Sequence, residues 1–364
     1  MSAGGPGRAG WTPTGDARAD LISQIEIDAA IAAASPSPFY EVLLGRMAED
    51  VRAGGPTWEL LERYAEEEAT EFFPFRALAG VHAEVLSGDR PELAERYPSA
   101  GGDGDADSAW PLVQAAFADR DAEVLADLAH PLQTNETSRC GALVGGFCEV
   151  AAQTGMPLRV LELGASAGLN LHFDRYRYEG GGVAFGPPDS PVRFSDYWEP
   201  GTPRLDAPVE VAERRGCDLS PIDPSTAEGR LLLESCVWPD EAERFATLRA
   251  AITIAAARPV VVEAASADDW IAAQLEQASP GLATIVYHSV FWDYPPAEVR
   301  ERMERTIREA GGRATNDAPL AWLSYEEGTE EPSVVELRLR TWPGGEERLL
   351  GTGRHHRHRV HWLG

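Results

Sequence analysis

The chain has 364 residues, of which 43 % are hydrophobic, and this length suits two domains or one large elaborated domain. Its formal net charge of −27 argues against nucleic acid and anionic membrane surfaces as partners, because both attract clustered positive charge. The chain lacks the long apolar run that a membrane-spanning helix needs. The four cysteines form no CxxC pair, and the first residues lack the apolar core of a signal peptide, which predicts reduced thiols in a cytoplasmic protein.

The first part of the chain carries helical patterns. Residues 1–18 are rich in Gly, Pro and Ala and are predicted to be a disordered tail. From residue 19 to residue 156, apolar side chains recur at the three- and four-residue spacing of amphipathic helices, as between Phe39 and Val51. This stretch shows no alternation typical of strands. We therefore predict an all-helical N-terminal domain or cap over residues 19–156.

From residue 157 to residue 364 the pattern changes to strands that alternate with helices. Short apolar segments predict strands, and the residues between them predict helices and an insertion near residues 174–206. The expected strands are 158–163, 209–217, 259–263, 283–288, 320–324, 334–341, 348–352 and one around Val360 and Trp362. This order is typical of a mostly parallel sheet that closes with an antiparallel hairpin, in an α/β domain.

The segment Gly164-Ala-Ser-Ala-Gly168 follows the first apolar strand and precedes a predicted helix. Glycines at such a place let the backbone approach a ligand closely. A dinucleotide fingerprint has a glycine in the middle, where the pyrophosphate lies, whereas this chain has Ser166. With the acidic Glu162 just before the loop, the pattern suits S-adenosylmethionine better than NAD(P) or FAD. A loop that binds neither stays open as an alternative.

The stretch VLELGASAGLNL resembles motif I of class I S-adenosylmethionine-dependent methyltransferases. The resemblance implies a Rossmann-like sheet and a set of cofactor-binding residues: Glu162, Gly164, Ser166, Gly168 and Asn170. The stretch GCDLSPI is similar to the second-strand motif of the same class, which implies that Asp218 holds the ribose hydroxyls. Asp218 lies 50 residues after Gly168, farther than the usual spacing of about 20. Glu179 is therefore a competing candidate, and a turn before Pro221 is the structural explanation of Asp218.

Nearly all of the chain from about Ser35 also resembles a family of uncharacterised bacterial proteins, the domain of unknown function 2332 family. The stretches that carry this resemblance are SPFYEVLL, YPSAGG, HPLQTNETSRC, LELGASAGLNL, RRGCDLSPIDP and ATIVYHSVFWDY. It implies that the helical part and the α/β part belong together, and it implies no known reaction.

One acidic and one aromatic side chain after the third predicted strand are candidates for the cofactor site. In methyltransferases this position contacts the adenine ring of the cofactor, so Asp268 and Trp270 are candidates for that contact. Asp268 also suits the start of the next helix, where a carboxylate caps free N–H groups. Both roles stay open.

The segment after the fourth predicted strand is rich in aromatic residues. His288 is a candidate base, because the pKa of an ordinary histidine is near neutral. Tyr287, Trp292 and Tyr294 would form an aromatic wall for a substrate. The alternative is a hydrogen-bonded histidine among core aromatics.

Before the last helix of the N-terminal part, Asn135, Glu136 and Arg139 are candidates for substrate binding. Arginine suits a substrate carboxylate, whereas helix capping explains Glu136 equally well. We expect no metal site, since the acidic run from Asp103 lacks the glycine and glutamate of a calcium loop.

The sequence thus predicts a class I methyltransferase-like α/β domain with a helical cap. The expected reaction is methyl transfer from S-adenosylmethionine to an O or N atom of an unknown small molecule. A non-catalytic ligand-binding or regulatory protein on the same fold is the first alternative. An NAD(P)- or FAD-dependent oxidoreductase is the second.

Overall fold

The chain divides into two compact units, and neither of them is a single continuous segment. The computed structural model describes residues 12–34, 37–65, 72–119, 128, 132–328, 334–354 and 357–364. The helical unit consists of residues 1–134 with 226–246, and the sheet unit consists of residues 135–225 with 247–364. This division differs from the boundary predicted at residue 156. Most of the predicted tail, residues 1–11, lies outside the described residues, and the helix α1 already begins at Ala17.

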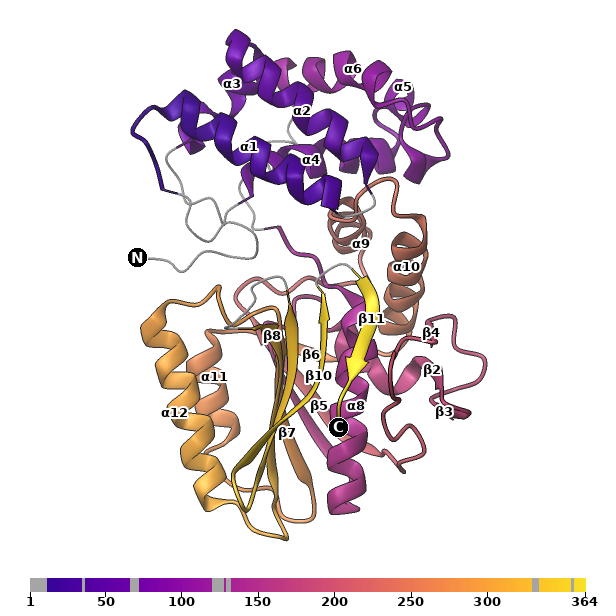
Figure 1. The fold of residues 1–364 in the computed structure, drawn as a ribbon, viewed down its shortest axis with the longest axis vertical. Coiled ribbons are helices and arrows are strands. Elements are labelled where there is room, and N and C mark those ends of the chain that lie inside the picture. The colour runs from indigo at the N-terminus through magenta and orange to yellow at the C-terminus, as the bar shows by residue number, and fades with distance from the viewer. Residues whose placement is uncertain are drawn as a thin grey trace. The chain divides into compact units, whose positions relative to one another are not determined.

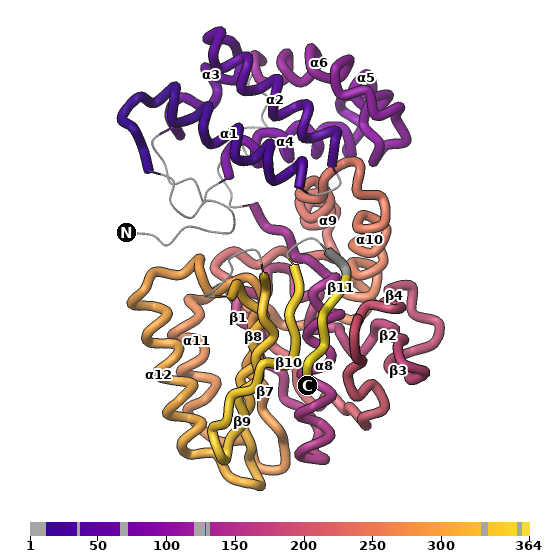
Figure 2. Tube along the Cα trace, viewed as in Figure 1, coloured from indigo at the N-terminus to yellow at the C-terminus, as the bar shows by residue number. Residues whose placement is uncertain are grey.

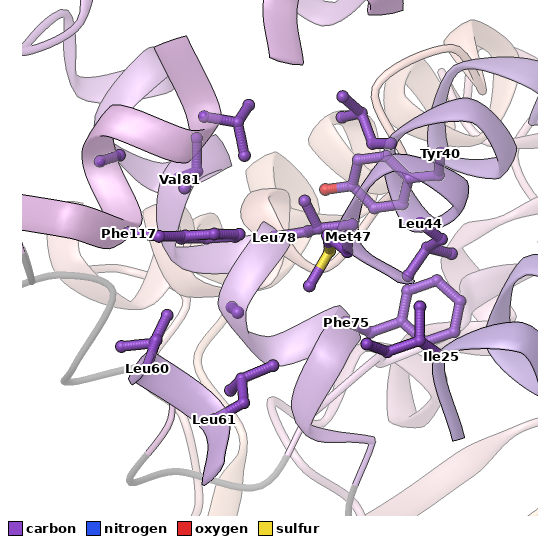
Figure 3. Packing of buried hydrophobic residues seen from close by; sticks show 14 of the residues in the cluster. Ile25, Tyr40, Leu44, Met47, Leu60, Leu61, Phe75, Leu78, Val81 and Phe117 are labelled. Carbon is purple, nitrogen blue, oxygen red and sulfur yellow. The ribbon is translucent and has the colours of Figure 1, made fainter. Parts of the chain in front are cut away.

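The helical unit has one apolar core. Its α-helices are α1 (Ala17–Ala34), α2 (Pro38–Ala53), α3 (Pro56–Leu61), α4 (Phe73–Ser87), α5 (Pro91–Ala94), α6 (Ala106–Asp119) and α9 (Ala227–Ser235), with short 3₁₀ helices at Glu62–Tyr64 and Pro98–Ala100. Figure 3 shows Tyr40, Leu44, Met47 and Phe75 packed together within this core. Trp238 stacks on Phe75 with ring centroids 5.4 Å apart, which explains why the later segment 226–246 folds with this unit.

The sheet unit is built on eight strands in the order β11-β10-β9-β8-β7-β1-β5-β6 (Figure 1). The strands are β1 (Leu158–Leu163), β5 (Val211–Asp218), β6 (Val261–Ala264), β7 (Ala283–Ser289), β8 (Leu320–Glu327), β9 (Val335–Trp342), β10 (Glu346–Arg354) and β11 (Arg357–Trp362). The neighbours from β6 to β8 pair in parallel, and β8 to β11 form an antiparallel edge. Figure 2 traces this edge as the yellow end of the chain. The predicted α/β class and the antiparallel edge are confirmed.

Helices cover both faces of this sheet (Figure 1). The helices α11 (Ala267–Gln274) and α12 (Ala297–Arg313) lie on one face, where Met303 and Ile307 pack with Leu161 of β1 and Val286 of β7. The helix α8 (Cys140–Thr154) packs on the strands β7 to β10. Side chains alternate between the faces of a strand, so the neighbours of Leu161 and Val286 point toward α8.

The inserted segment between β1 and β5 forms a second, three-stranded sheet in the order β3-β2-β4. Its strands are β2 (Arg177–Gly180), β3 (Val183–Phe185) and β4 (Arg193–Ser195). The helix α10 (Ala242–Ala257) connects the segment 226–246 back to the sheet unit. Among the residues that the structure describes, no helix is long and apolar enough to span a bilayer.

Candidate functional site

The strand order reverses at β1, which pairs with β5 on one side and with β7 on the other. In open α/β sheets, ligands bind at such a reversal, in the crevice outside the carboxyl ends of the strands. The loops that begin at Gly164, after Asp218 and after Ser289 leave β1, β5 and β7 at this edge. The candidate site is therefore built from the sheet unit alone.

The loop after β1 turns through left-handed backbone conformations. The φ angles are 69° at Gly164, 51° at Ser166 and 70° at Gly168, and only glycine adopts such values without steric cost. The segment that follows is a 3₁₀ helix, Leu169–Arg175, with a kink at His172. The helix predicted after the loop is thus present as a short 3₁₀ helix and not as an α-helix, because the chain soon turns into the inserted sheet.

Backbone N–H groups of the loop donate hydrogen bonds inside the protein. Ser166 donates to Asp218 Oδ2 at 2.8 Å, and Leu169 donates to Asn135 Oδ1 at 3.0 Å. The N–H groups of Ala165 and Gly168 donate to backbone carbonyls at 2.9 and 2.7 Å. These four donors already have protein acceptors, so they are not available to a pyrophosphate.

Asp218 lies at the carboxyl end of β5, beside the glycine loop. Its Oδ1 accepts the N–H of Ser220 at 2.9 Å, which is the turn that the structural explanation required. Each carboxylate oxygen has two acceptor sites, so Asp218 can still accept from a ligand hydroxyl. Glu179, the competing candidate, lies on β2 in the separate small sheet and pairs with Arg177 and Arg193. Only Asp218 of these two therefore lies at the edge of the main sheet.

Glu162 is buried just before the loop, with 2 % of its surface exposed. Its Oε2 atom makes no close hydrogen bond, and neither does the buried hydroxyl of Tyr287, its register partner on β7, although Tyr287 and Asn170 lie near enough to lower the pKa of the Glu162 carboxyl. Burial raises the pKa of the Glu162 carboxyl to about 8, and Tyr287 and Arg139 only partly offset this rise. The buried acid therefore stays protonated near neutral pH and ionises when a cationic group pairs with it, so this position suits a cationic ligand group.

His288 lies at the end of β7, 1 % exposed, and both of its ring nitrogens are engaged. Nδ1 contacts Glu326 Oε1 at 2.5 Å, and Nε2 accepts the indole N–H of Trp322 at 2.9 Å. Because an indole nitrogen only donates, Nε2 must be unprotonated and Nδ1 must carry the proton. This neutral histidine has no nitrogen left for a substrate proton, so the geometry does not support its predicted role as base.

The loop after β7 is fixed by Glu326, which the sequence reasoning missed. The Glu326 carboxylate accepts the N–H of Phe291 at 3.1 Å and that of Trp292 at 3.3 Å. Val290 takes a strained φ of 47°, and Trp292 stacks on His288 at 4.7 Å. The only sequence signal for this role of Glu326 is its position as an acidic residue near the end of a strand. The neighbouring sequence does not indicate that its partners lie about 35 residues earlier.

This loop places an aromatic ring on the glycine loop. A Cβ atom at Gly164 would lie 2.2 Å from Cδ2 of Phe291, so the ring occupies the space that the glycine leaves open. Of the predicted aromatic wall, Tyr287 is buried and contacts Phe147 edge-on at 5.1 Å. Tyr294 is 58 % exposed. The wall is therefore not one surface: Phe291, which was not predicted, is the ring that meets the glycine loop.

Asp268 and Trp270, predicted to contact adenine, are held by other protein groups. Asp268 accepts from Arg302 at 2.6 Å and from Ser266, and it lies in the first turn of α11 rather than at its cap. The indole N–H of Trp270 donates to Glu263 at 2.8 Å, and the ring is 4 % exposed within the apolar cluster under α11 and α12. Both side chains therefore have structural partners.

The three predicted residues before α8 converge on the same edge. The side-chain oxygen of Asn135 accepts the N–H of Leu169 at the end of the glycine loop. Glu136 accepts the N–H of Ser138 at 3.1 Å as the N-cap of the 3₁₀ helix Thr137–Arg139. Arg139 donates to the carbonyl of Ser289 at 2.8 Å. Asn170, predicted from the motif, accepts from the buried thiol of Cys140 at 3.2 Å.

Fold and loop together define an open α/β protein whose glycine loop lies at the reversal of the strand order. The chain belongs to the family of uncharacterised proteins conserved in bacteria, domain of unknown function 2332 (DUF2332), whose family model matches residues 23–362. The predicted membership of this family is confirmed. No curated protein and no solved structure was found to match the chain.

Proposed function

We propose that this protein binds S-adenosylmethionine at the glycine loop and transfers its methyl group to an O or N atom of a small molecule. The observation that carries the proposal is the orphaned Oε2 atom of Glu162. A buried carboxylate with an open acceptor beside a glycine loop favours a ligand that brings a positive charge. The ammonium group of S-adenosylmethionine is such a charge.

The strand order also supports the proposal that S-adenosylmethionine binds at the glycine loop. Numbered along the chain, the parallel strands β6-β5-β1-β7-β8 follow the order 3-2-1-4-5 that Rossmann-type sheets have. In that comparison Asp218 ends the second strand, where an acidic residue accepts ribose hydroxyls. Glu162 would hold the ammonium group, and Asp218 would hold the ribose.

The loop fits a dinucleotide less well. Four of its N–H groups already donate to protein acceptors, and Ser166 stands where a pyrophosphate needs a glycine. These features disfavour the oxidoreductase alternative.

S-adenosylmethionine supplies, when bound, a methyl group on a positively charged sulfur. The chain then has to bind and orient the two reactants, which by itself accounts for a large rate enhancement. Because His288 has both nitrogens engaged, we assign no base, and the acceptor would have to lose its proton to water or to its own groups.

The proposal is tested by calorimetric titration of the protein with S-adenosylhomocysteine and, separately, with NAD. We expect a binding isotherm with the first ligand and none with the second. Methyl transfer is then followed with labelled S-adenosylmethionine across small alcohols, amines and acids. Absence of binding by both S-adenosylhomocysteine and S-adenosylmethionine, or tighter binding of NAD, would overturn the proposal.

A second candidate is a ligand-binding protein without turnover. The observation in its favour is again the locked, neutral His288, since this protein then lacks the one general base that the sequence indicated. Binding of S-adenosylhomocysteine without methyl transfer to any acceptor would favour this second function.

A further inference from the structure

Arg139 is a half-buried cation that contacts a backbone carbonyl instead of a carboxylate. Its Nη1 donates to the Ser289 carbonyl at 2.8 Å, at the carboxyl end of β7. Within the described residues no carboxylate lies within salt-bridge distance of it, whereas Arg159 and Arg214 of the same unit pair with acids at 3.0 and 2.6 Å. A guanidinium has five N–H donors, so Arg139 keeps donors for a ligand.

Glu162 is an acidic group near the same end of the sheet, and it becomes an anion when a cation binds to it. It pairs in register with Tyr287, and Ser289 follows two residues later, roughly 7 Å along the strand. Glu162 and Tyr287 point toward α8, and Arg139 is the residue from which α8 begins. An arginine and a buried acid thus lie near each other on one face of the sheet without forming an ion pair, and the Oε2 atom of the acid, which is more than nine-tenths buried, makes no close hydrogen bond.

We propose that Arg139 and Glu162 together bind an α-amino acid group, with its carboxylate on Arg139 and its ammonium on Glu162. This inference rests on the proposed function, because S-adenosylmethionine ends in such a group. A free amino acid carries the same chemistry and is the other source. Glu136, the acidic residue nearest to Arg139 in the sequence, already accepts the N–H of Ser138, so its carboxylate has a role in the local turn.

The two-ended arrangement makes a specific demand on the ligand. A ligand with the ammonium but without the carboxylate leaves Arg139 without a ligand partner. A ligand that has neither group leaves Glu162 without a ligand partner as well. A hydrogen bond to a charged group contributes enough that each missing group should weaken binding about tenfold to a hundredfold. This stepwise loss is the signature of the proposed pair.

The test is calorimetry on the full chain with three ligands: S-adenosylhomocysteine, its decarboxylated analogue, and 5′-methylthioadenosine, which lacks the whole amino acid group. The variants are Arg139→Gln, Arg139→Lys and the control Arg313→Gln. Arg313 also donates to a backbone carbonyl, that of Leu275 at 3.1 Å, but it lies at the end of α12. Its loss should leave all three affinities unchanged.

We expect wild type to bind the decarboxylated analogue about tenfold to a hundredfold more weakly than S-adenosylhomocysteine. Arg139→Gln should lose this preference and bind both equally, and Arg139→Lys should keep part of it. The ratio is measured within one variant, so a modest loss of folding stability does not imitate it. A preference that survives in Arg139→Gln would overturn the inference.

The experiment also separates this inference from the proposed function. If no nucleoside binds, the proposed function fails, and free methionine is titrated next. Binding of methionine that Arg139→Gln weakens at least tenfold would keep the amino acid site. No binding of methionine would remove it as well.

Discussion

Replacing Glu162 by Gln should stabilise the protein in a way that depends on pH. Burial raises the pKa of the Glu162 carboxyl from its ordinary value of 4.5 to about 8. A carboxyl whose pKa is higher in the folded state binds more protons folded than unfolded, so the wild type loses stability as pH rises between these two values. Glutamine has the shape of the protonated acid and does not titrate, so Glu162→Gln should escape this loss.

The size of this loss of stability follows from 1.36 kcal/mol for each unit of pKa difference between the folded and unfolded states. At about pH 5.5 the wild type has lost roughly 1 kcal/mol, and at about pH 8.5 it has lost roughly 4 to 5 kcal/mol. The stability gained by Glu162→Gln should therefore grow by roughly 3 kcal/mol between these two pH values.

Urea unfolding of both proteins at the two pH values, followed by tryptophan fluorescence, measures this difference. The control is Glu298→Gln, which removes an exposed carboxyl on α12 and should give the same small change at both pH values. A difference between wild type and Glu162→Gln that does not change with pH would refute the reasoning about this buried acid.

Three further substitutions test the rest of the site. Gly164→Ala puts a Cβ 2.2 Å from Phe291 at a residue whose φ is 69°. This substitution should lower the free energy of unfolding in urea by about 1 to 3 kcal/mol and remove ligand binding. The control Gly312→Ala on α12 meets nothing within 4 Å and should not destabilise the protein. Glu326→Ala removes the acceptor of three donors and should cost about 2 to 3 kcal/mol, with Glu326→Gln intermediate; a loss below about 0.5 kcal/mol would contradict the role of this carboxylate. Trp270→Phe should cost about 1 to 3 kcal/mol through the lost bond to Glu263 while ligand affinity stays constant, and a selective loss of affinity would return Trp270 to the binding site.

Periodicity and loop composition were enough to predict the sheet strands and the glycine loop. Strands β1, β5, β6 and β7 lie within a few residues of their predicted ranges. The resemblance of GCDLSPI to a second-strand motif indicated Asp218 in spite of its unusual distance from Gly168, and Asp218 does lie beside the glycine loop, because the carboxyl ends of parallel strands share one edge. These are features that local sequence determines.

Long-range contacts decided the rest. The segment 226–246 folds with the helical unit because Trp238 stacks on Phe75, and α8 folds with the sheet because its side chains pack on β7 and β8. His288 looked like a base from its position alone, but Glu326 and Trp322 engage both of its nitrogens. Nothing near His288 in the sequence reveals either partner.

The central claim, that Glu162 at the glycine loop receives the ammonium group of S-adenosylmethionine, is tested most directly by counting protons released on binding. Because the pKa of the Glu162 carboxyl in the ligand-free protein is about 8, Glu162 is mostly protonated at about pH 7 and must ionise to hold a cation. Calorimetry with S-adenosylhomocysteine in two buffers of different ionisation enthalpy should show release of close to one proton for wild type and none for Glu162→Gln, with weaker binding. Binding without proton release, or the same release from both proteins, would contradict the account.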